Sequence, residues 1–177
     1  MLRPERAIDS QLIYDGKIVR FRVDTVVLPD GATARREIIG TPGAVAIVAL
    51  TGDRQVRLVR QYRSAIADFL LELPAGTLEP GEAPEAAAPR ELAEETGDHA
   101  RHWRRLTSIH TTPGICDETL HIFLATGLTP GPSSPDADEY IEVVTLPLDR
   151  ALAMVRSGQI SDAKTIAGLL LTAVILE

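Results

Sequence analysis

One segment of the chain, residues 76–98 (GTLEPGEAPEAAAPRELAEETGD), carries carboxylates at a spacing that can do chemistry. Glu91 and Glu95 are four positions apart, so on a helix both side chains lie on one face. Two like charges at that spacing are mildly destabilising unless a positive charge lies between them. Glu94 is adjacent, and Glu82 comes from the preceding loop. Carboxylates that converge in this way form a hard oxygen site, which suits Mg²⁺ or Mn²⁺ rather than zinc.

Two further residues of the segment can hold such a site in place. Arg90 can pair with Glu94 at i+4 or with Glu82, which would fix the carboxylates in position. Gly76 lets the chain turn sharply after Ala75 and present a backbone carbonyl to the metal. The chemistry that this set predicts is metal-assisted attack of water on phosphorus, in which cations neutralise a diphosphate and stabilise the leaving phosphate.

The whole segment is more specific than its helical part, because Arg-Glu-Leu-Ala-Glu-Glu alone is typical of an ordinary solvated helix face. The segment follows the pattern Gly, five residues, Glu, seven residues, Arg-Glu-apolar-any-Glu-Glu-any-Gly. The matching residues are Gly76, Glu82, Arg90, Glu91, Leu92, Glu94, Glu95 and Gly97. At about 7% abundance per residue type, seven polar or glycine matches at fixed offsets would arise by chance about once in a million such chains. The pattern resembles the signature of the Nudix hydrolases.

The segment departs from that signature at one position and contains an unusual proline. Asp98 stands where the signature usually has an apolar residue, which predicts a mild loss of packing at the helix end. Pro89 would lie beyond the first turn of a helix that begins at Pro84, where it removes one hydrogen bond and crowds the previous turn. The helix therefore either begins later or is kinked just before Arg90, and the metal face after the proline is expected to survive.

The elements that must position these residues can be predicted from periodicity. The apolar run Val45–Leu50 predicts a buried central strand. A helix is expected from Pro84 to Thr96, with Gly97 as its C-terminal stop. Further strands are expected at Val56–Tyr62, Phe69–Leu73, Trp103–Ile109, Thr119–Ala125 and Tyr140–Leu146, and further helices at Asp149–Arg156 and, capped by Ser161, up to Leu176. Strands and helices mix without regular alternation, which indicates an α+β fold rather than a doubly wound sheet.

The N-terminal part of the chain reads as an addition to this fold. Ile18–Leu28 alternates crudely and is rich in valine, a turn follows at Pro29-Asp30-Gly31, and Arg35–Ile39 can return as a second strand. We therefore expect a small antiparallel sheet, and divide the chain into an N-terminal β segment, residues 1–40, and a second domain, residues 41–177. The Pro-, Gly- and Ser-rich stretch between Gly127 and Asp138 reads as a loop rather than a domain linker.

Composition narrows the class of protein. The 177 residues carry a net charge of −7, which disfavours non-specific nucleic-acid binding. Cys116 is the single cysteine, so no intrachain disulfide can form. The first ten residues lack the apolar core of a signal peptide, and the longest apolar run, Ala167–Leu176, is too short to span a bilayer. The four histidines, His99, His102, His110 and His121, are scattered. The expectation is a cytoplasmic enzyme without a membrane partner.

The resemblance extends beyond the signature, to most of the chain from about residue 12 onward. Five pieces resemble the ADP-ribose pyrophosphatase branch of the Nudix hydrolases: residues 42–47 (PGAVAI), 58–63 (LVRQYR), 71–76 (LELPAG), 113–118 (with Pro-Gly and Asp-Glu) and 158–165 (GQISDAKT). The branch implies a Nudix-type α/β/α sandwich with a mixed sheet, preceded by the small N-terminal antiparallel sheet. It also implies a homodimer in which the N-terminal segment dimerises.

The resemblance further implies roles for individual residues. The substrate would be bound by Arg63, Arg35, Arg36, Glu37, Gly114 and Glu118, and metal would be held by Ala75, Glu82, Glu91 and Glu95. Arg63 would bind phosphates, and the Arg35–Glu37 strand would reach the ligand across the dimer interface. The alternative for Arg63 is a surface arginine at a strand end, and the alternative for residues 35–37 is an ordinary hairpin charge pair.

The catalytic set would comprise Glu91, Glu94, Glu95 and a base in the loop before Tyr140. Asp138, Glu139 and Glu142 are candidates for the base, and Glu139 is preferred. An acidic flexible loop beside a strand would explain the same residues.

The activity expected from the resemblance is metal-dependent hydrolysis of ADP-ribose to AMP and ribose 5-phosphate, with Mg²⁺ as the cofactor and Mn²⁺ as its alternative. One alternative is hydrolysis of another nucleoside diphosphate sugar, such as a GDP-sugar, or of a dinucleotide. Another is a non-catalytic module that binds a nucleotide sugar. Such modules usually have a degraded carboxylate set, whereas Glu82, Glu91, Glu94 and Glu95 are all present here.

Overall fold

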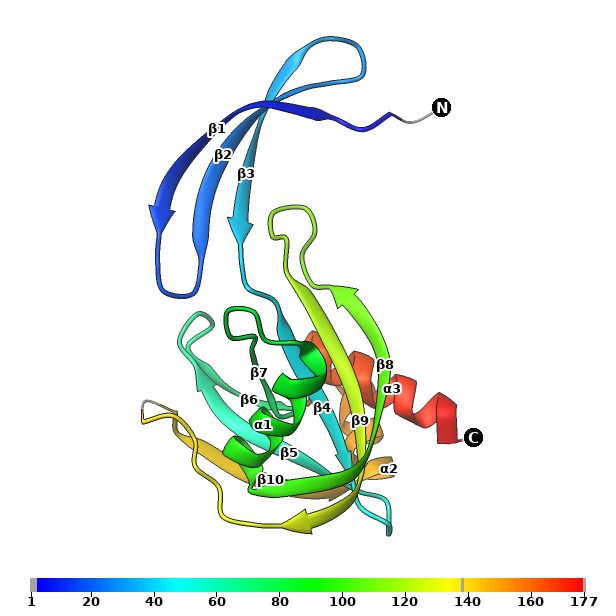
Figure 1. The fold of residues 1–177 in the computed structure, drawn as a ribbon. Helices are drawn as coiled ribbons and strands as arrows, with labels where there is room; N and C mark the ends of the chain where they lie inside the picture. Colours follow the sequence, from blue (N-terminus) through cyan, green and yellow to red (C-terminus); the bar gives the residue numbers. More distant parts are fainter. Residues whose placement is uncertain (1–2, 138, 177) are drawn as a thin grey trace. The chain divides into compact units, whose positions relative to one another are not determined.

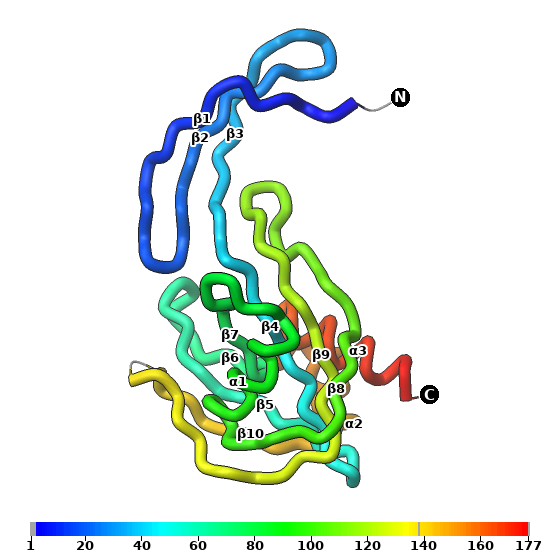
Figure 2. Tube along the Cα trace, in the orientation of Figure 1, coloured from blue at the N-terminus to red at the C-terminus, as the bar shows by residue number. Residues whose placement is uncertain are grey.

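The computed structural model describes residues 3–137 and 139–176, which form two compact units (Figures 1 and 2). The first unit comprises the described residues up to Gly43 together with His110–Thr119. The second unit comprises Ala44–Ile109 and the described residues from Leu120 onward.

The first unit is built on a three-stranded antiparallel sheet. Its strands are β1 (Arg6–Asp15), β2 (Arg20–Val27) and β3 (Thr33–Gly40), in the order β1-β2-β3. The predicted turn between β2 and β3 is present, with Gly31 at φ 89°. Strand β1 was not predicted, because its charged N-terminal half shows no alternation and all ten of its residues are exposed. Only pairing with β2 defines it as a strand.

Residues 110–119 complete the first unit by pairing with β3. The Ile39 N–H donates to the Ile115 carbonyl over 2.7 Å, and the Asp117 N–H donates to the Ile39 carbonyl over 3.1 Å. The side chain of Asp117 also accepts a hydrogen bond from the Thr41 N–H over 2.9 Å. Two pieces of chain that are far apart in sequence therefore share one hydrogen-bonded unit.

The second unit is a mixed sheet with helices on both faces (Figure 1). The main strand order is β10-β5-β4-β9-β8, with β6 beside β5 and β7 beside β4; β4 and β9 are parallel. The strands are β4 (Ala44–Leu50), β5 (Gln55–Arg63), β6 (Asp68–Glu72), β7 (Ala75–Thr77), β8 (Asp98–His110), β9 (Thr119–Pro130) and β10 (Ile141–Pro147), and the helices are α1 (Pro84–Thr96), α2 (Leu148–Arg156) and α3 (Ala163–Leu176). This arrangement confirms the α+β, Nudix-type α/β/α sandwich expected from the sequence.

Strand β4 is buried on both faces, as its continuous apolar run predicted. Val45, Ile47 and Ala49 belong to the hydrophobic cluster that contains Ala87, Ala88 and Leu92 of α1. The alternate residues Ala46, Val48 and Leu50 belong to the cluster that contains residues of α2 and α3. Because successive side chains of a strand point to opposite faces, this strand anchors both layers of helices and fixes where α1 lies.

Several expected boundaries move. Strand β8 begins five residues before the predicted Trp103, and β9 continues to Pro130, so the predicted loop from Gly127 begins later. The three-residue strand β7 was not predicted. The predicted Ser161 cap is wrong by one residue, because the Asp162 carboxylate accepts the hydrogen bond from the Thr165 N–H at the start of α3.

Helix α1 has the predicted limits, and Pro89 lies inside it. Of the two alternatives considered for Pro89, the later start of the helix is therefore excluded. Gly97 ends the helix at φ 74° and donates to the Ala93 carbonyl, as predicted. The expected loss of packing at Asp98 is also wrong. This residue is buried and accepts a 2.8 Å hydrogen bond from Arg57 Nε of β5, so an ion pair replaces the apolar contact.

Candidate active site

Arg90 is the centre of the carboxylate cluster on α1 and the preceding loop. Its Nε and Nη2 atoms donate to the two oxygens of Glu82 over 2.9 and 2.8 Å. Its Nη1 atom donates to Glu91 Oε1 over 2.8 Å and to Glu94 Oε2 over 2.9 Å. Both predicted partners, Glu82 and Glu94, are thus present together, and Arg90 supplies the positive charge that close carboxylates need.

The bidentate contact ties the loop to the helix. Hydrogen bonds from Arg90 and from the Glu79 N–H lower the pKa of Glu82 to about 2, so this carboxylate is ionised at every physiological pH. Glu82 and Arg90 therefore form a fixed ion pair next to the other carboxylates. In the described structure, both oxygens of Glu82 already accept hydrogen bonds.

Glu91 lies directly against the backbone of Gly76. A Cβ atom built on Gly76 would be 2.0 Å from Glu91 Cδ, so a larger residue here would occupy the space of the carboxylate. Glu91 is 9% exposed, and burial raises its pKa despite the opposing attraction of Arg90. The glycine of the signature is therefore required by the close approach of a functional side chain to the strand β7.

Glu95 completes the buried part of the cluster, one helical turn from Glu91. Its Oε2 atom accepts a 3.1 Å hydrogen bond from the Ala75 N–H, and the residue is 4% exposed. Burial raises the pKa of Glu95 to about 8, and the nearby charges of Glu139 and Glu91 add to this effect. A cation beside Glu95 would favour its ionised form.

The donor set fits a divalent cation such as magnesium. Glu91 and Glu95 offer hard oxygen atoms on adjacent turns, next to the backbone of Ala75. Within residues 3–137 and 139–176, no three acidic, histidine or cysteine side chains are arranged to hold a metal ion by themselves. Such a pair suits Mg²⁺, which is usually held by one or two carboxylates and completed by water and substrate phosphates.

Arg63 lies at the end of β5 and is held by a buried carboxylate. Its Nε and Nη2 atoms donate to Glu72 Oε1 and Oε2, both over 2.8 Å. Hydrogen bonding to Glu72 raises the pKa of Arg63, and the charge of Glu95 contributes to the same shift. Arg63 is therefore within electrostatic range of the carboxylate cluster, on the same unit.

The candidates for the base differ in their surroundings. The charge of Glu139 contributes to the raised pKa of both Glu91 and Glu95, so its carboxylate lies within electrostatic range of the cluster. Glu142 instead lies 3.7 Å from Arg60 on the neighbouring strand, exposed to solvent. Asp138 lies outside the described residues.

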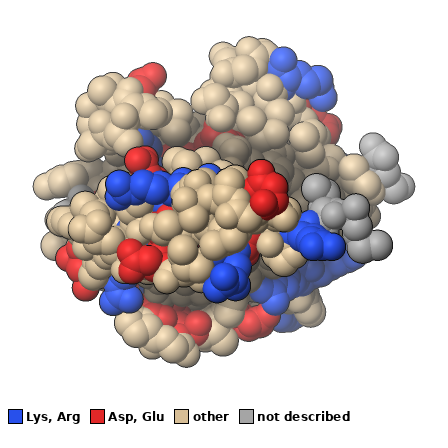
Figure 3. All heavy atoms as spheres, turned by 90° about the horizontal axis from the view of Figure 1, so that it is seen from above, with Lys and Arg blue, Asp and Glu red and all other residues tan. Residues whose placement is uncertain are grey.

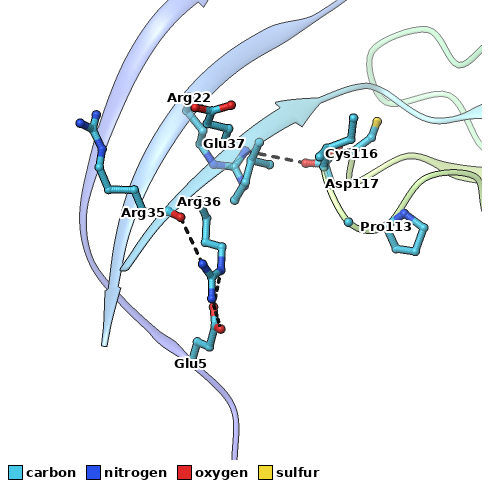
Figure 4. A pocket seen from close by; sticks show the side chains of 11 residues that line it. Glu5, Arg22, Arg35, Arg36, Glu37, Pro113, Cys116 and Asp117 are labelled. Atoms are coloured by element: carbon cyan, nitrogen blue, oxygen red, sulfur yellow. Dashed lines mark hydrogen bonds and ion pairs between the residues drawn. The ribbon is translucent and has the colours of Figure 1, made fainter. Parts of the chain in front are cut away.

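The substrate residues expected in the first unit lie around one pocket of about 640 Å³ (Figure 4). Arg35, Arg36, Glu37 and Gly114 all line it, together with Glu5, Arg22 and residues 115–117. Arg36 donates to Glu5 Oε2 over 2.9 Å, whereas the Arg35 side chain extends away from this pair. Glu118 does not line the pocket and accepts a 2.7 Å hydrogen bond from Thr111.

Sequence reasoning did not predict two of the ion pairs that the structure shows. Glu72 and Lys164 belong to motifs quoted for the resemblance, and their side chains form an ion pair with each other. The Arg57–Asp98 pair joins residues 41 positions apart. A single sequence does not reveal such partners, because pairing across a sheet depends on strand order.

The basic and acidic side chains on the face shown in Figure 3 are interspersed, not gathered into one basic patch.

Comparison with known proteins shows that the chain belongs to the Nudix hydrolase family. The NUDIX domain family matches residues 40–169, and the family described as nucleoside diphosphate sugar hydrolase N-terminal domain matches residues 5–39. No helix in the described part of the chain is long and apolar enough to cross a membrane.

Two curated relatives match over most of their length. The ADP-ribose pyrophosphatase of Bacillus subtilis is 41% identical over 163 residues, covering 91% of this chain and 88% of the relative. The methanol dehydrogenase activator of Bacillus methanolicus is 40% identical over 164 residues, covering 92% and 89%. A crystal structure of an ADP compounds hydrolase has the same fold, with a TM-score of 0.89 at 23% identity over 99% of this chain and 96% of that one. Enzymes of this family generally need a divalent metal ion.

Proposed function

We propose that this chain hydrolyses the diphosphate bond of ADP-ribose, giving AMP and ribose 5-phosphate, with Mg²⁺ as its metal and Mn²⁺ as a substitute. The observation that carries the proposal is the pair of buried carboxylates, Glu91 and Glu95, packed against the turn at Ala75 and Gly76. The choice of ADP-ribose is supported by the relative from Bacillus subtilis that bears this activity in its name.

The metal would be held by Glu91, Glu95 and the carbonyl of Ala75, with Glu82 reaching it directly or through water. When bound, it supplies positive charge to the diphosphate and lowers the pKa of a bound water. Glu94 shares Nη1 of Arg90 with Glu91 and so helps to orient the catalytic face of α1.

Glu139 would accept the proton of the attacking water. Its charge acts on Glu91 and Glu95, so it is the candidate with an electrostatic link to the proposed metal ligands. Glu142 is a poorer candidate because it is engaged by Arg60.

The substrate would be recognised by two sets of residues. Arg63 would bind the phosphates, since a guanidinium offers two parallel hydrogen bonds to an oxyanion. Arg35, Arg36 and Glu37, which line the pocket of the first unit, would reach the ligand across the proposed dimer interface, and Gly114 would also contribute to substrate binding. Glu118 would assist near the phosphates.

We also propose that the chain is a cytoplasmic homodimer, with residues 1–40 as the dimerising segment and residues 41–177 as the catalytic domain. Strand β1 exposes Ile8, Leu12, Ile13 and Tyr14, each about half accessible. Monomers rarely leave so many large apolar side chains together on one strand. Light scattering at micromolar concentration should therefore give twice the chain mass, and a fully active monomer would contradict this part of the proposal.

A second candidate function is the activation of a dehydrogenase. It is supported by the methanol dehydrogenase activator, which is 40% identical to this chain, compared with 41% for the pyrophosphatase. In that case the partner would be a dehydrogenase rather than a small nucleoside diphosphate alone. Addition of the chain to a purified methanol dehydrogenase, with and without Glu95→Gln, separates the two functions. Activation that survives the substitution would favour a role independent of hydrolysis.

The direct test of the proposed reaction is product analysis. Purified protein is incubated with ADP-ribose and Mg²⁺, and AMP and ribose 5-phosphate are quantified by chromatography. Equimolar products that disappear on chelation of the metal are expected. No AMP with any divalent metal would contradict the proposal.

A further inference from the structure

Two motifs that contain charged residues without an assigned role, Glu72 and Lys164, meet in the second unit. Residues 71–76 end β6 and lead to the turn at Ala75, whereas residues 158–165 lead into α3. Lys164 Nζ donates to Glu72 Oε2, and Thr165 Oγ1 accepts a 2.8 Å hydrogen bond from the Leu73 N–H. The two motifs are thus joined by one backbone contact and one ion pair.

The ion pair is part of a row of alternating charges. Asp162 Oδ1 lies 3.1 Å from Lys164 Nζ, Lys164 binds Glu72, and Glu72 binds Arg63 through both carboxylate oxygens. Glu72 is 1% exposed and the side chain of Lys164 is 15% exposed, so these charges are shielded from water. Burial pushes the pKa of Glu72 up, but its hydrogen bonds and the charges of Arg63 and Lys164 outweigh this, and the pKa is lowered.

The contact with Glu72 leaves one edge of the Arg63 guanidinium available. Glu72 occupies the edge formed by Nε and Nη2. Within the described residues, Nη1 of Arg63 has no hydrogen-bond partner, so the edge formed by Nη1 and the second Nη2 hydrogen can receive an oxyanion. Glu72 therefore orients Arg63 without blocking it.

The same carboxylate creates an electrostatic difficulty. A fully ionised Glu72 would cancel the positive charge of Arg63, which would then attract a phosphate weakly beside Glu91 and Glu95. Lys164 binds Oε2 of Glu72 from the other side and balances this negative charge. Resting on the proposed function, we infer that Lys164 is a positioning residue that keeps the positive charge of Arg63 available to the substrate phosphates.

The first test is the Lys164→Met variant, assayed with ADP-ribose and Mg²⁺. KM should rise about tenfold or more, because the variant weakens phosphate binding to the same extent in the ground state and the transition state. For the same reason kcat should change less than threefold. Lys164→Arg should recover most of the loss. Lys17 is the only other lysine of the chain and is exposed, so Lys17→Met is the matched control and should leave KM unchanged. An unchanged KM in Lys164→Met would overturn the inference.

A double variant separates charge balance from a merely structural tie between α3 and β6. Glu72→Gln removes the negative charge that Lys164 balances, while the glutamine oxygen can still accept a hydrogen bond from Arg63. Glu72→Gln/Lys164→Met should therefore have a lower KM than Lys164→Met alone. If Lys164 only fastens the helix, the double variant has a KM as high as the single variant or higher, and the inference fails.

Asp162→Asn removes a negative charge beside Lys164, whereas Lys164→Met removes a positive one. It therefore tests the inference even if Lys164→Met is unstable. Asparagine caps a helix about as well as aspartate, so α3 should be preserved. Removing this negative charge should leave KM equal or lower, and a clear rise in KM would contradict charge balance.

Binding of ADP, measured by calorimetry, distinguishes failure of this inference from failure of the proposed function. ADP carries a diphosphate whichever nucleotide is the true substrate. If the wild-type protein does not cleave ADP-ribose, only the proposed function fails. If Lys164→Met binds ADP as tightly as wild type does, the present inference fails, whatever the substrate.

Discussion

The carboxylate cluster of α1 and the pocket of the first unit differ in how their charges are held. In the cluster, Arg90 contacts three carboxylates, and Glu91 and Glu95 are buried against the backbone. In the pocket, Arg35 and Glu37 are exposed, and Arg36 is held by one exposed partner, Glu5. The metal-binding carboxylates proposed on α1 are therefore fixed by packing, whereas the recognition residues proposed in the first unit lie on a surface that can vary without disturbing the core.

The largest effect should come from the buried carboxylates. Glu91→Gln and Glu95→Gln should each lower kcat by about a thousandfold or more, because each removes a charge proposed to hold the metal. Steady-state assays with Mg²⁺, together with circular dichroism to confirm the fold, provide the measurement. Near-normal turnover in either variant would show that the site has been misplaced.

The carboxylate cluster and the pocket also differ in how much space surrounds a glycine, Gly76 in the cluster and Gly114 in the pocket. Gly76→Ala should lower activity by about a hundredfold, because the new Cβ would lie 2.0 Å from Glu91 Cδ. Gly114→Ala gives the comparison in the first unit: a Cβ there meets nothing within 4 Å, so kcat should stay near the wild-type value even if binding of the substrate changes. Measured kcat values that fall equally in both variants would remove the distinction between the regions.

The proposed base, Glu139, should affect the chemical step rather than binding. Glu139→Gln should lower kcat by about a hundredfold and change KM little, because a proton acceptor acts mainly in the transition state. Glu142→Gln should have a small effect, since this side chain lies beside Arg60. Equal losses in Glu142→Gln, or in Asp138→Asn, would move the role to that residue.

Residues of the exposed pocket in the first unit should affect only the binding of the substrate. Arg36→Ala should raise KM for ADP-ribose by about fivefold to tenfold with kcat nearly unchanged, as expected for loss of uniform binding. A fall in kcat larger than the rise in KM would mean that the first unit contributes to the chemical step.

The smallest effect concerns acid stability. The pKa of Glu72 is lowered by Arg63 and Lys164, so the contribution of Glu72 to folding is present above the unfolded pKa near 4.5 and lost as pH falls through the lower folded value. Denaturant titrations between pH 5 and 3 should show a shallower decline for Glu72→Gln than for wild type. Glu5→Gln should decline as wild type does, because an exposed pair with Arg36 is screened by solvent.

The signature predicted the cluster well because its spacing is local. Helix α1 positions Glu91 and Glu95 by helical periodicity alone, and Gly76 is close in sequence. The sequence did not predict the ion pairs around Arg63 and Asp98, because Glu72, Lys164 and Arg57 take part in them through strand pairing and helix packing. Strand β1 was missed for a related reason, since an exposed strand shows no alternation of burial. Pro89 shows that tertiary packing of Ala87, Ala88 and Leu92 overrides a local preference.

The most direct test of the central claim is the ratio of kcat/KM for ADP-ribose to that for GDP-mannose, dinucleoside polyphosphates and NADH, measured with Mg²⁺ under one set of conditions. The account predicts that ADP-ribose is preferred over each competitor by a wide margin, and that Glu95→Gln abolishes turnover of all of them. A GDP-sugar or NADH that proves better by tenfold or more would contradict the assignment to ADP-ribose, while leaving the carboxylate chemistry in place.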